Sequence, residues 1–187
     1  MFKIYLELGF DHILDLNAYD HILFVMTLCV IYAVSQWKEI LFLVTAFTIG
    51  HTITLALSTL GIVKISGTII EYLIPVTIIL TAIYNVFKVK AENHKITLHY
   101  TLASFFGLIH GLGFSNYLKA LLGSEEDLIV PLLAFNIGVE LGQIVIVGLT
   151  IMLSMLLVKR MRLQHKYWVW GVSTMAILVS VKLIWDL

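Results

Sequence analysis

Long apolar runs alternate with short polar connections along nearly the whole chain. An α-helix needs about 20 apolar residues to cross a hydrocarbon layer of about 30 Å, and most of the runs have roughly that length. Residues 1–16 differ, because they mix apolar side chains with Lys3, Glu7 and Asp11 in the manner of a short interfacial or re-entrant helix. We therefore predict an all-α integral membrane protein with a single transmembrane domain over residues 1–187. The expected bundle of six transmembrane helices has its spans at residues 19–35, 40–60, 68–87, 98–122, 128–158 and 167–185.

The composition agrees with this class. Hydrophobic residues make up 60% of the chain and the mean hydropathy is +0.97, which is more apolar than a soluble domain of this size can bury. The formal net charge is zero, so nucleic acid is not an expected partner. Cys29 is the single cysteine, which excludes an internal disulfide and a metal site with several thiolates.

The positive charges favour one orientation in the membrane. The connections after the first, third and fifth predicted spans hold eight lysines and arginines, whereas the opposite face holds four. Because cytoplasmic connections carry the excess of positive charge, both termini are expected outside the cytoplasm. We predict a multi-pass protein of the bacterial inner membrane, in contact with lipid, and the sequence leaves a homo-oligomer or a metalloprotein partner open.

Five of the apolar runs contain ionisable side chains. Such groups are costly inside a bilayer and mark function by default. With a helical rise of about 1.5 Å per residue, all of them lie between the outer surface and the middle of the membrane. We therefore expect one polar site, whose main members are Asp20, His21, His51, His110 and Glu140.

Helical periodicity places further polar groups near these candidates. Residues spaced by three, four or seven positions share one face of a helix, and a polar face in a membrane helix turns away from lipid. Gly107 and Gly111 flank His110 and allow a second backbone to approach it closely. The second group of candidates contains Glu71, Asn136, Thr48, Thr52 and Gln143.

The candidate groups have the chemistry of a metal site. Imidazole and carboxylate groups from separate helices form a nitrogen and oxygen ligand set suited to Ni²⁺, Co²⁺ or Zn²⁺. Metal-bound histidines need a polar group on the other ring nitrogen, and Asp20, Asn136 and the threonines around His51 suit that role. The alternative is that each histidine only bridges two neighbouring helices.

The inner halves of the predicted spans look different. They contain no ladder of ionisable groups and offer only Asn85 and Ser104 as polar side chains. His99 lies beside a predicted cytoplasmic connection and is expected to be solvated. The sequence therefore predicts a site that opens to the outer face, without a polar path to the inner face.

Segments around the candidates occur in five of the six predicted spans: YDHILF at 19–24, FTIGHTITL at 47–55, IE at 70–71, Asn85, FGLIHGLGF at 106–114 and FNIGVELGQ at 135–143. With His12, they resemble the HupE/UreJ family of membrane proteins, which are proposed nickel or cobalt permeases. In that family, five residues separate a histidine from the Asp-His pair that follows it. Here seven residues separate His12 from Asp20, and Ala18 stands where a glycine is usual, so His12 joins the second group of candidates.

Three functions fit the predicted site. The resemblance implies binding and transport of a divalent metal such as nickel or cobalt through the intramembrane site. The other function is an intramembrane zinc-dependent hydrolase or transferase acting on a lipid or lipidated substrate, with Glu140 or Asp20 as the catalytic carboxylate. A membrane factor that passes metal ions to a partner is a third possibility, and the resemblance favours transport.

Overall fold

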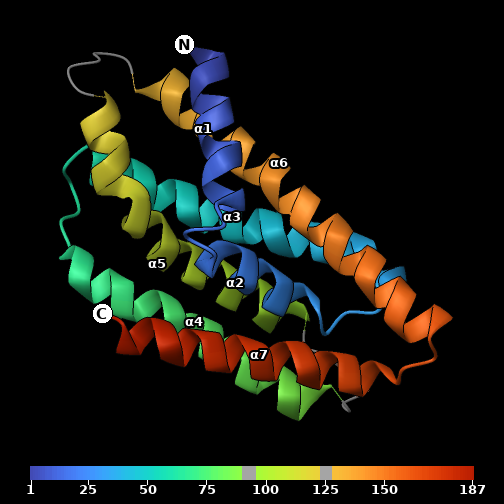
Figure 1. The fold of residues 1–187 in the computed structure, drawn as a ribbon. Helices are drawn as coiled ribbons and strands as arrows, with labels where there is room; N and C mark the ends of the chain where they lie inside the picture. The colour runs from blue at the N-terminus through green and yellow to red at the C-terminus, as the bar shows by residue number, and fades with distance from the viewer. Residues whose placement is uncertain (90–95, 123–127) are drawn as a thin grey trace.

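The computed structural model describes residues 1–89, 96–122 and 128–187, and all regular structure within these residues is helical (Figure 1). The predicted all-α class is confirmed. A 3₁₀ turn at Val34–Gln36 leads into one helix, and a π-helical segment at Met155–Arg160 continues another. The α-helices are α1 (Phe2–Leu14), α2 (Asp20–Cys29), α3 (Trp37–Thr59), α4 (Gly67–Lys88), α5 (Ile96–Leu122), α6 (Ile129–Ser154) and α7 (His165–Trp185).

Four helical segments of the described residues are long and apolar enough to cross a membrane. They give the protein the character of a helical membrane protein. α5 has 27 residues but is not one of the four, and polar side chains such as His99, Ser104 and His110 interrupt its apolar ones. The count of six spans stays a prediction. The four segments are Val34–Thr59, Gly67–Lys88, Ile129–Arg160 and His165–Trp185.

The predicted span at 19–35 contains a shorter helix than expected. α2 has ten residues and ends at Cys29, so it is about 15 Å long. Val30, Ile31 and Tyr32 are buried without continuing the helix, because apolar character indicates burial and not helical continuity. The connection predicted between the first two spans, at residues 36–39, is helical in the structure, because the 3₁₀ turn begins at Val34 and α3 follows at Trp37.

α1 supplies the length that α2 lacks. It runs from the chain start to the middle of the bundle, and α2 continues toward the other end after a linker at 15–19 (Figure 1). The two helices have 13 and ten residues, or about 20 and 15 Å, and together match one crossing of a hydrocarbon layer about 30 Å thick. α1 also packs closely on α6, because a Cβ added at Gly138 would overlap the Leu6 carbonyl oxygen.

Glycines bring α3 and α5 into backbone contact as well. A Cβ added at Gly107 would overlap the carbonyl oxygen of Phe47, and one at Gly111 would overlap that of His51. Lipid is as apolar as a leucine side chain, so membrane helices associate through close packing of small residues rather than through the hydrophobic effect. This contact holds His51 next to the segment that contains His110.

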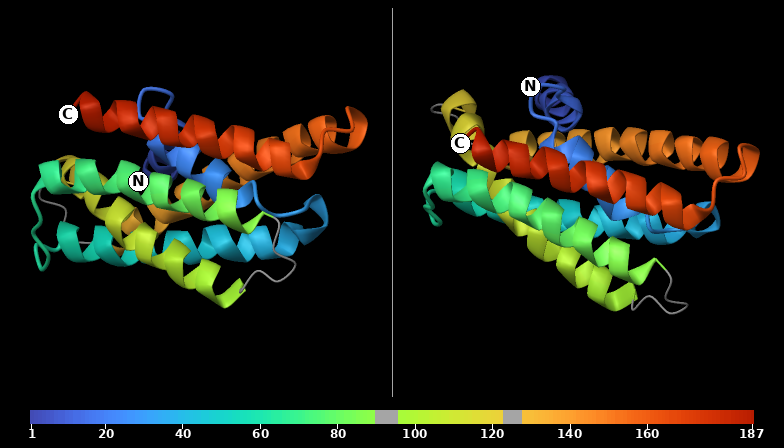
Figure 2. Two further views of the ribbon diagram at one scale, coloured as in Figure 1. Left: turned by 90° about the horizontal axis from the view of Figure 1, so that it is seen from below. Right: turned by 60° about the horizontal axis from the view of Figure 1, so that its bottom comes forward.

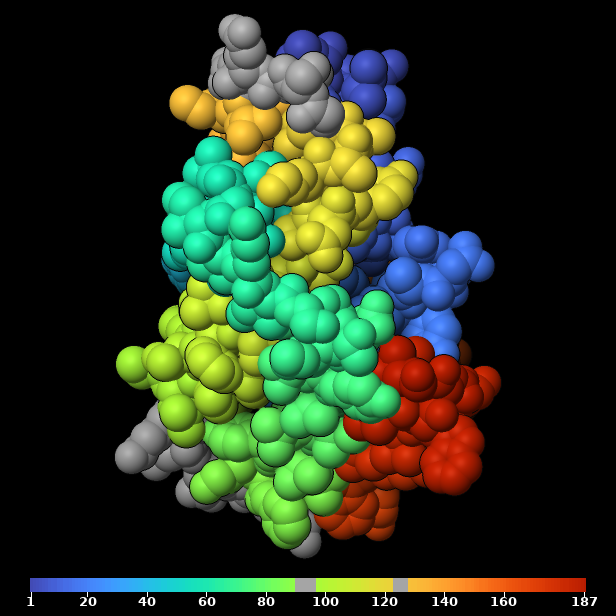
Figure 3. Space-filling model, turned by 90° about the vertical axis from the view of Figure 1, so that its left-hand side faces the viewer, coloured from blue at the N-terminus to red at the C-terminus, as the bar shows by residue number. Residues whose placement is uncertain are grey.

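Both chain ends lie at the same end of the bundle, which we call the terminal end. The connection at 60–66 lies there too, whereas the connections at 30–36 and 161–164 lie at the opposite end (Figures 1 and 2). Figure 3 shows the terminal end in space-filling form, with the last turns of α5 and the start of α4 exposed on it. Chain ends on one side are the arrangement that an even number of passes produces.

The glycine contact between α3 and α5 can be tested by adding a methyl group. We expect Gly107→Ala to lower the free energy of unfolding by about 1–3 kcal/mol, because the new Cβ overlaps the Phe47 backbone. Gly148→Ala on α6 is the matched control, since a Cβ there meets nothing within 4 Å. Thermal unfolding in detergent micelles measures both variants. An unchanged Gly107→Ala protein would contradict the close contact.

Candidate metal site

Three histidines from three helices bring their side chains together. His12 lies in the last turn of α1, His21 in the first turn of α2 and His51 in the middle of α3. Each offers one ring nitrogen or more, and the three ligand atoms lie within 4.8 Å of one another. Nitrogens bound to one tetrahedral zinc ion lie about 3.4 Å apart, so a small contraction brings these groups to ligand distance. We call His12, His21 and His51 the histidine cluster.

The interruption between α1 and α2 makes the cluster possible. A continuous helix would separate His12 and His21 by about 13 Å along its axis, whereas their ring centres lie 4.6 Å apart. The backbone N–H of Asn17 donates a 2.8 Å hydrogen bond to Asp15 Oδ1 and closes a turn in the linker. Interrupted helices line the ion and substrate sites of many transporters for the same reason.

Asp20 orients His21. Its Oδ1 lies 3.2 Å from His21 Nδ1 and also accepts a 2.9 Å hydrogen bond from the His21 backbone N–H. When the ring donates from Nδ1 to the carboxylate, Nε2 keeps its lone pair. Nε2 is buried and has no hydrogen-bond partner among the residues that the structure describes. A histidine held by a carboxylate in this way is prepared to bind a metal ion.

His51 is fully buried, and its ring has no hydrogen-bond partner within the described ranges. Asn136 lies beside the ring without completing a hydrogen bond to it. Phe135 stacks on the ring, with 6.3 Å between the centres. Burying an unpaired polar group costs about 1–3 kcal/mol, so a cation that bound His51 together with His12 and His21 would remove several such costs at once.

His12 completes the cluster from the side of α1. Its ring packs on Phe114 with 3.9 Å between the centres, and its buried Nε2 has no hydrogen-bond partner in the described part of the chain. The sequence placed His12 only in the second group of candidates. The structure brings it next to His21 and His51.

His110 lies deeper, on α5, with its ring centre 5.2 Å from that of His21. Its Nε2 lies 3.0 Å from the hydroxyl of Thr77, and this hydroxyl also donates a 2.7 Å hydrogen bond to the Ile74 carbonyl. The proton between His110 and Thr77 therefore comes from Nε2, and Nδ1 keeps its lone pair. Nδ1 is buried and unpaired as far as the described residues extend.

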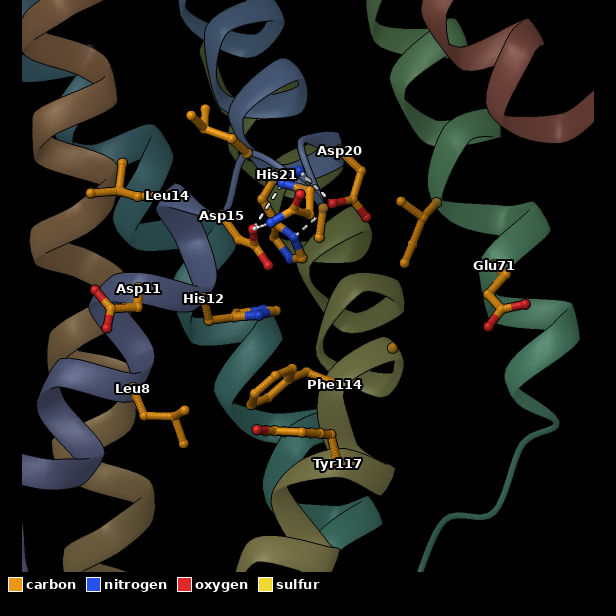
Figure 4. Close-up of a pocket in the computed structure, with 15 residues that line it drawn as sticks. Leu8, Asp11, His12, Leu14, Asp15, Asp20, His21, Glu71, Phe114 and Tyr117 are labelled. Atoms are coloured by element: carbon orange, nitrogen blue, oxygen red, sulfur yellow. Dashed lines mark hydrogen bonds and ion pairs between the residues drawn. The ribbon is translucent and has the colours of Figure 1, made fainter. Parts of the chain in front are cut away.

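A cavity of about 870 Å³ leads to the cluster. Figure 4 shows the imidazole of His12 pointing into it and Glu71 on the far wall, on α4. Leu16 and Asn17 line it and are exposed, so the cavity reaches the surface. Negative charge along such a cavity raises the local concentration of cations. Its carboxylates are Asp11, Asp15, Asp20 and Glu71.

Glu140 and most of the second group lie in a neighbouring polar layer between α3 and α6. Glu140 Oε1 accepts a 2.5 Å hydrogen bond from Thr45, and Gln143 Oε1 accepts one of 2.7 Å from Thr48. The Thr52 hydroxyl donates to the Thr48 carbonyl of its own helix. The bonds of Glu140 and Gln143 join α3 to α6, and none of the described contacts connects Glu140 to the histidine cluster.

Two features of the site were not evident from the sequence. The sequence predicts a short helix over 1–16 and a span from 19, but it does not indicate that the first helix enters the bundle, so the position of His12 could not be derived. Thr77 was not a candidate, although Thr77, Thr81 and Asn85 are spaced by four residues and share one face of α4. That spacing was the available signal.

The family comparison covers almost the entire chain. The family model described as HupE / UreJ protein matches residues 1–186. The chain belongs to the HupE/UreJ family. The resemblance noted in the sequence is thereby confirmed, and the family suggests metal transport. No curated protein and no solved structure matches the chain.

The roles of the two carboxylates in this HupE/UreJ protein can be separated by matched amide substitutions. We expect Asp20→Asn to weaken metal binding about 10–100-fold, because it removes the carboxylate that orients His21. Glu140→Gln is expected to weaken it less, because Glu140 is bonded to Thr45. Calorimetric titration of the purified protein with Ni²⁺, Co²⁺ and Zn²⁺ measures both. A larger loss for Glu140→Gln would return Glu140 to the ligand set.

Proposed function

We propose that this HupE/UreJ protein binds a divalent transition metal at the histidine cluster and carries it across the membrane. Family membership supports transport, and convergent imidazoles from three helices support binding. The observation that carries the proposal is the helix interruption, which brings the rings of His12 and His21 to 4.6 Å beside His51. A structural role for these residues would not require three histidines at one point.

The proposed ligands are ring nitrogens of His12, His21 and His51, with His110 as the next group inward. Neutral nitrogen ligands suit Ni²⁺, Co²⁺ and Zn²⁺, whereas Mg²⁺ and Ca²⁺ prefer oxygen. Asp20 orients His21 and contributes negative charge that balances the ion. The polar layer that contains Glu140 holds α6 against α3 in this proposal.

The proposal includes an orientation in the membrane. Counting α1 and α2 as one interrupted crossing gives six passes together with α3, α4, α5, α6 and α7. The excess of positive charge then assigns the opposite end to the cytoplasm and the terminal end to the outside of a bacterial inner membrane. The carboxylates of the cavity, Asp11 and Glu71 among them, would gather cations before they reach the cluster.

A second candidate function is an intramembrane zinc-dependent hydrolase or transferase. Three histidines with an open fourth position are also the ligand set of catalytic zinc, which activates a bound water. The observation in favour is the cavity of about 870 Å³, large enough for part of a lipid and lined by apolar side chains such as Leu8 and Phe114. Asp20 is the carboxylate next to the cluster and would accept a proton.

Metal binding and uptake test the proposal directly. We expect the purified protein to bind Ni²⁺ or Co²⁺, and proteoliposomes that contain it to accumulate the same ion. His51→Ala should weaken binding by more than about tenfold, because it removes a ligand. His165→Ala is the matched control, since His165 begins α7 at the opposite end. Elemental analysis of the purified protein and radioactive nickel uptake measure the two effects.

The same measurements separate the two candidate functions. Uptake that His51→Ala abolishes supports the carrier. Tightly bound Zn²⁺ without uptake, together with hydrolysis of a lipid ester or amide, supports the enzyme. A protein that neither binds nor transports any of the three metals contradicts both.

A further inference from the structure

Buried polar groups continue beyond the histidine cluster along one face of α4. Thr77, Thr81 and Asn85 follow one another at intervals of four residues, and their exposed fractions are 2%, 8% and 1%. From Thr77 to Asn85 the helix rises about 12 Å toward the opposite end of the bundle. The sequence indicated only Asn85 and Ser104 as polar side chains in the inner halves of the predicted spans, so the structure reveals a longer polar series.

His110 joins this series to the cluster. Its ring lies 5.2 Å from His21 on one side, and its Nε2 is bonded to Thr77 on the other. His110 is fully buried, so it can exchange neither partner for water. It therefore links the polar face of α4 to the histidine cluster, which we also call the outer cluster because it lies toward the proposed outer face.

The series ends in a second cavity of about 370 Å³, separate from the first. Thr81, Asn85 and His99 line it together with Tyr84 and apolar side chains. His99 was expected to be solvated, which is wrong, because its exposed fraction is 6%. It is buried because, in the first turns of α5, it packs against Tyr32 and Tyr84.

His99 is held in place at the far end of the cavity. Its Nδ1 lies 2.5 Å from the hydroxyl of Tyr32, which belongs to the connection at 30–36, and its ring meets Tyr84 edge to face at 4.6 Å. The cavity thus extends the polar series to the end of the bundle opposite the chain termini.

Aromatic side chains separate the two cavities. The ring of Phe24 lies 4.7 Å from His110 and 6.1 Å from Phe106, and Phe106 lines the second cavity. Phe47 covers another side of His110, at 5.2 Å. A cation that passed from the outer cluster to the second cavity would move past His110 as Phe24 turned aside.

A purely structural role accounts for only part of these features. The Thr81 hydroxyl donates to the Thr77 carbonyl, and Asn85 donates from Nδ2 to the Thr27 carbonyl at 2.6 Å, so both support the packing of α4. Packing alone does not explain why these groups and His99 surround an open space in the middle of apolar side chains. An amide, a hydroxyl and an imidazole at a cavity are ligands for a cation.

We propose that Thr81, Asn85 and His99 form an inner site that receives the divalent cation from the outer cluster by way of His110. The inference rests on the proposed transport function and adds the inner half of its path. One imidazole and two neutral oxygen ligands bind a transition metal more weakly than three imidazoles do. Conduction requires such weak binding at the exit, since an ion must leave the protein as readily as it enters.

Two apolar substitutions test the path. Thr81→Val and Asn85→Leu should keep tight binding of one ion at the outer cluster but slow its uptake into proteoliposomes by about tenfold or more, the factor expected from losing a polar contact to a charged group. Thr101→Val is the matched control, since Thr101 makes the same type of bond within α5 but is exposed, away from the cavity. Uptake unchanged in Thr81→Val and Asn85→Leu overturns the inner site.

Asn85→Asp tests the inner site through the number of bound metal ions, which would not increase if Asn85 had only a structural role. A carboxylate at this position should trap the cation, so that equilibrium dialysis with Ni²⁺, Co²⁺ or Zn²⁺ alone finds one more bound ion than in the unsubstituted protein. This binding test needs no transport, so it applies even if Asn85→Leu does not fold. An Asn85→Asp protein that binds no additional ion overturns the inner site. A failure of the unsubstituted protein to bind any ion would instead contradict the outer cluster and the proposed function.

Discussion

Unpaired nitrogen atoms on buried imidazole rings are the feature on which the rest of the structure depends. His12, His21, His51 and His110 each keep at least one such nitrogen among the described residues. In a medium of low dielectric each costs free energy, and folding offers many ways to avoid that cost. Most hydroxyls of the bundle do avoid it by bonding to a carbonyl of their own helix, as Thr150 does. A histidine that only bridges helices would do the same, so four such rings close to one another support the proposed cation site.

Close backbone contact keeps these rings in place, and it also divides the bundle. α1 packs closely on α6 through Gly138, and α3 packs closely on α5 through Gly107, so His12 belongs to one packed pair and His51 to the other. His21 lies between them on the short helix α2. A movement of one pair against the other therefore changes the distance between His12 and His51 directly. In the proposed transport function, relative motion of the two pairs would open or close the site, as alternating access requires, and this motion would have to break the bonds between α3 and α6.

The sequence predicted the helical membrane class, and among its candidates the ring of His21 lies 6.2 Å from that of His51 and 5.2 Å from that of His110. Depth along a helix was enough to group these three as candidates, because rise per residue is constant. Depth does not give the crossing angle between helices, however. Glu140 has the depth expected of a ligand but accepts a hydrogen bond from Thr45 on α3, and spacing along one helix does not reveal which neighbour a side chain meets. The position of His12 depends on how far the first helix enters the bundle, which the apolar pattern of residues 1–16 does not reveal.

The two cavities differ in charge, and that difference bears on the direction of transport. The outer cavity carries four carboxylates, whereas Thr81, Asn85 and His99 contribute no formal negative charge to the inner one. In the proposed transport function, a divalent cation would therefore be concentrated at the outer cavity and held less strongly at the inner one. In the proposed orientation the membrane potential adds to this, since about 2.3 kcal/mol per charge at 100 mV amounts to about 4.6 kcal/mol for a divalent ion crossing the whole layer. In the proposed transport function, that free energy would offset the weaker coordination at the inner site. The contact of Phe24 with His110 would remain as a steric barrier between the two cavities.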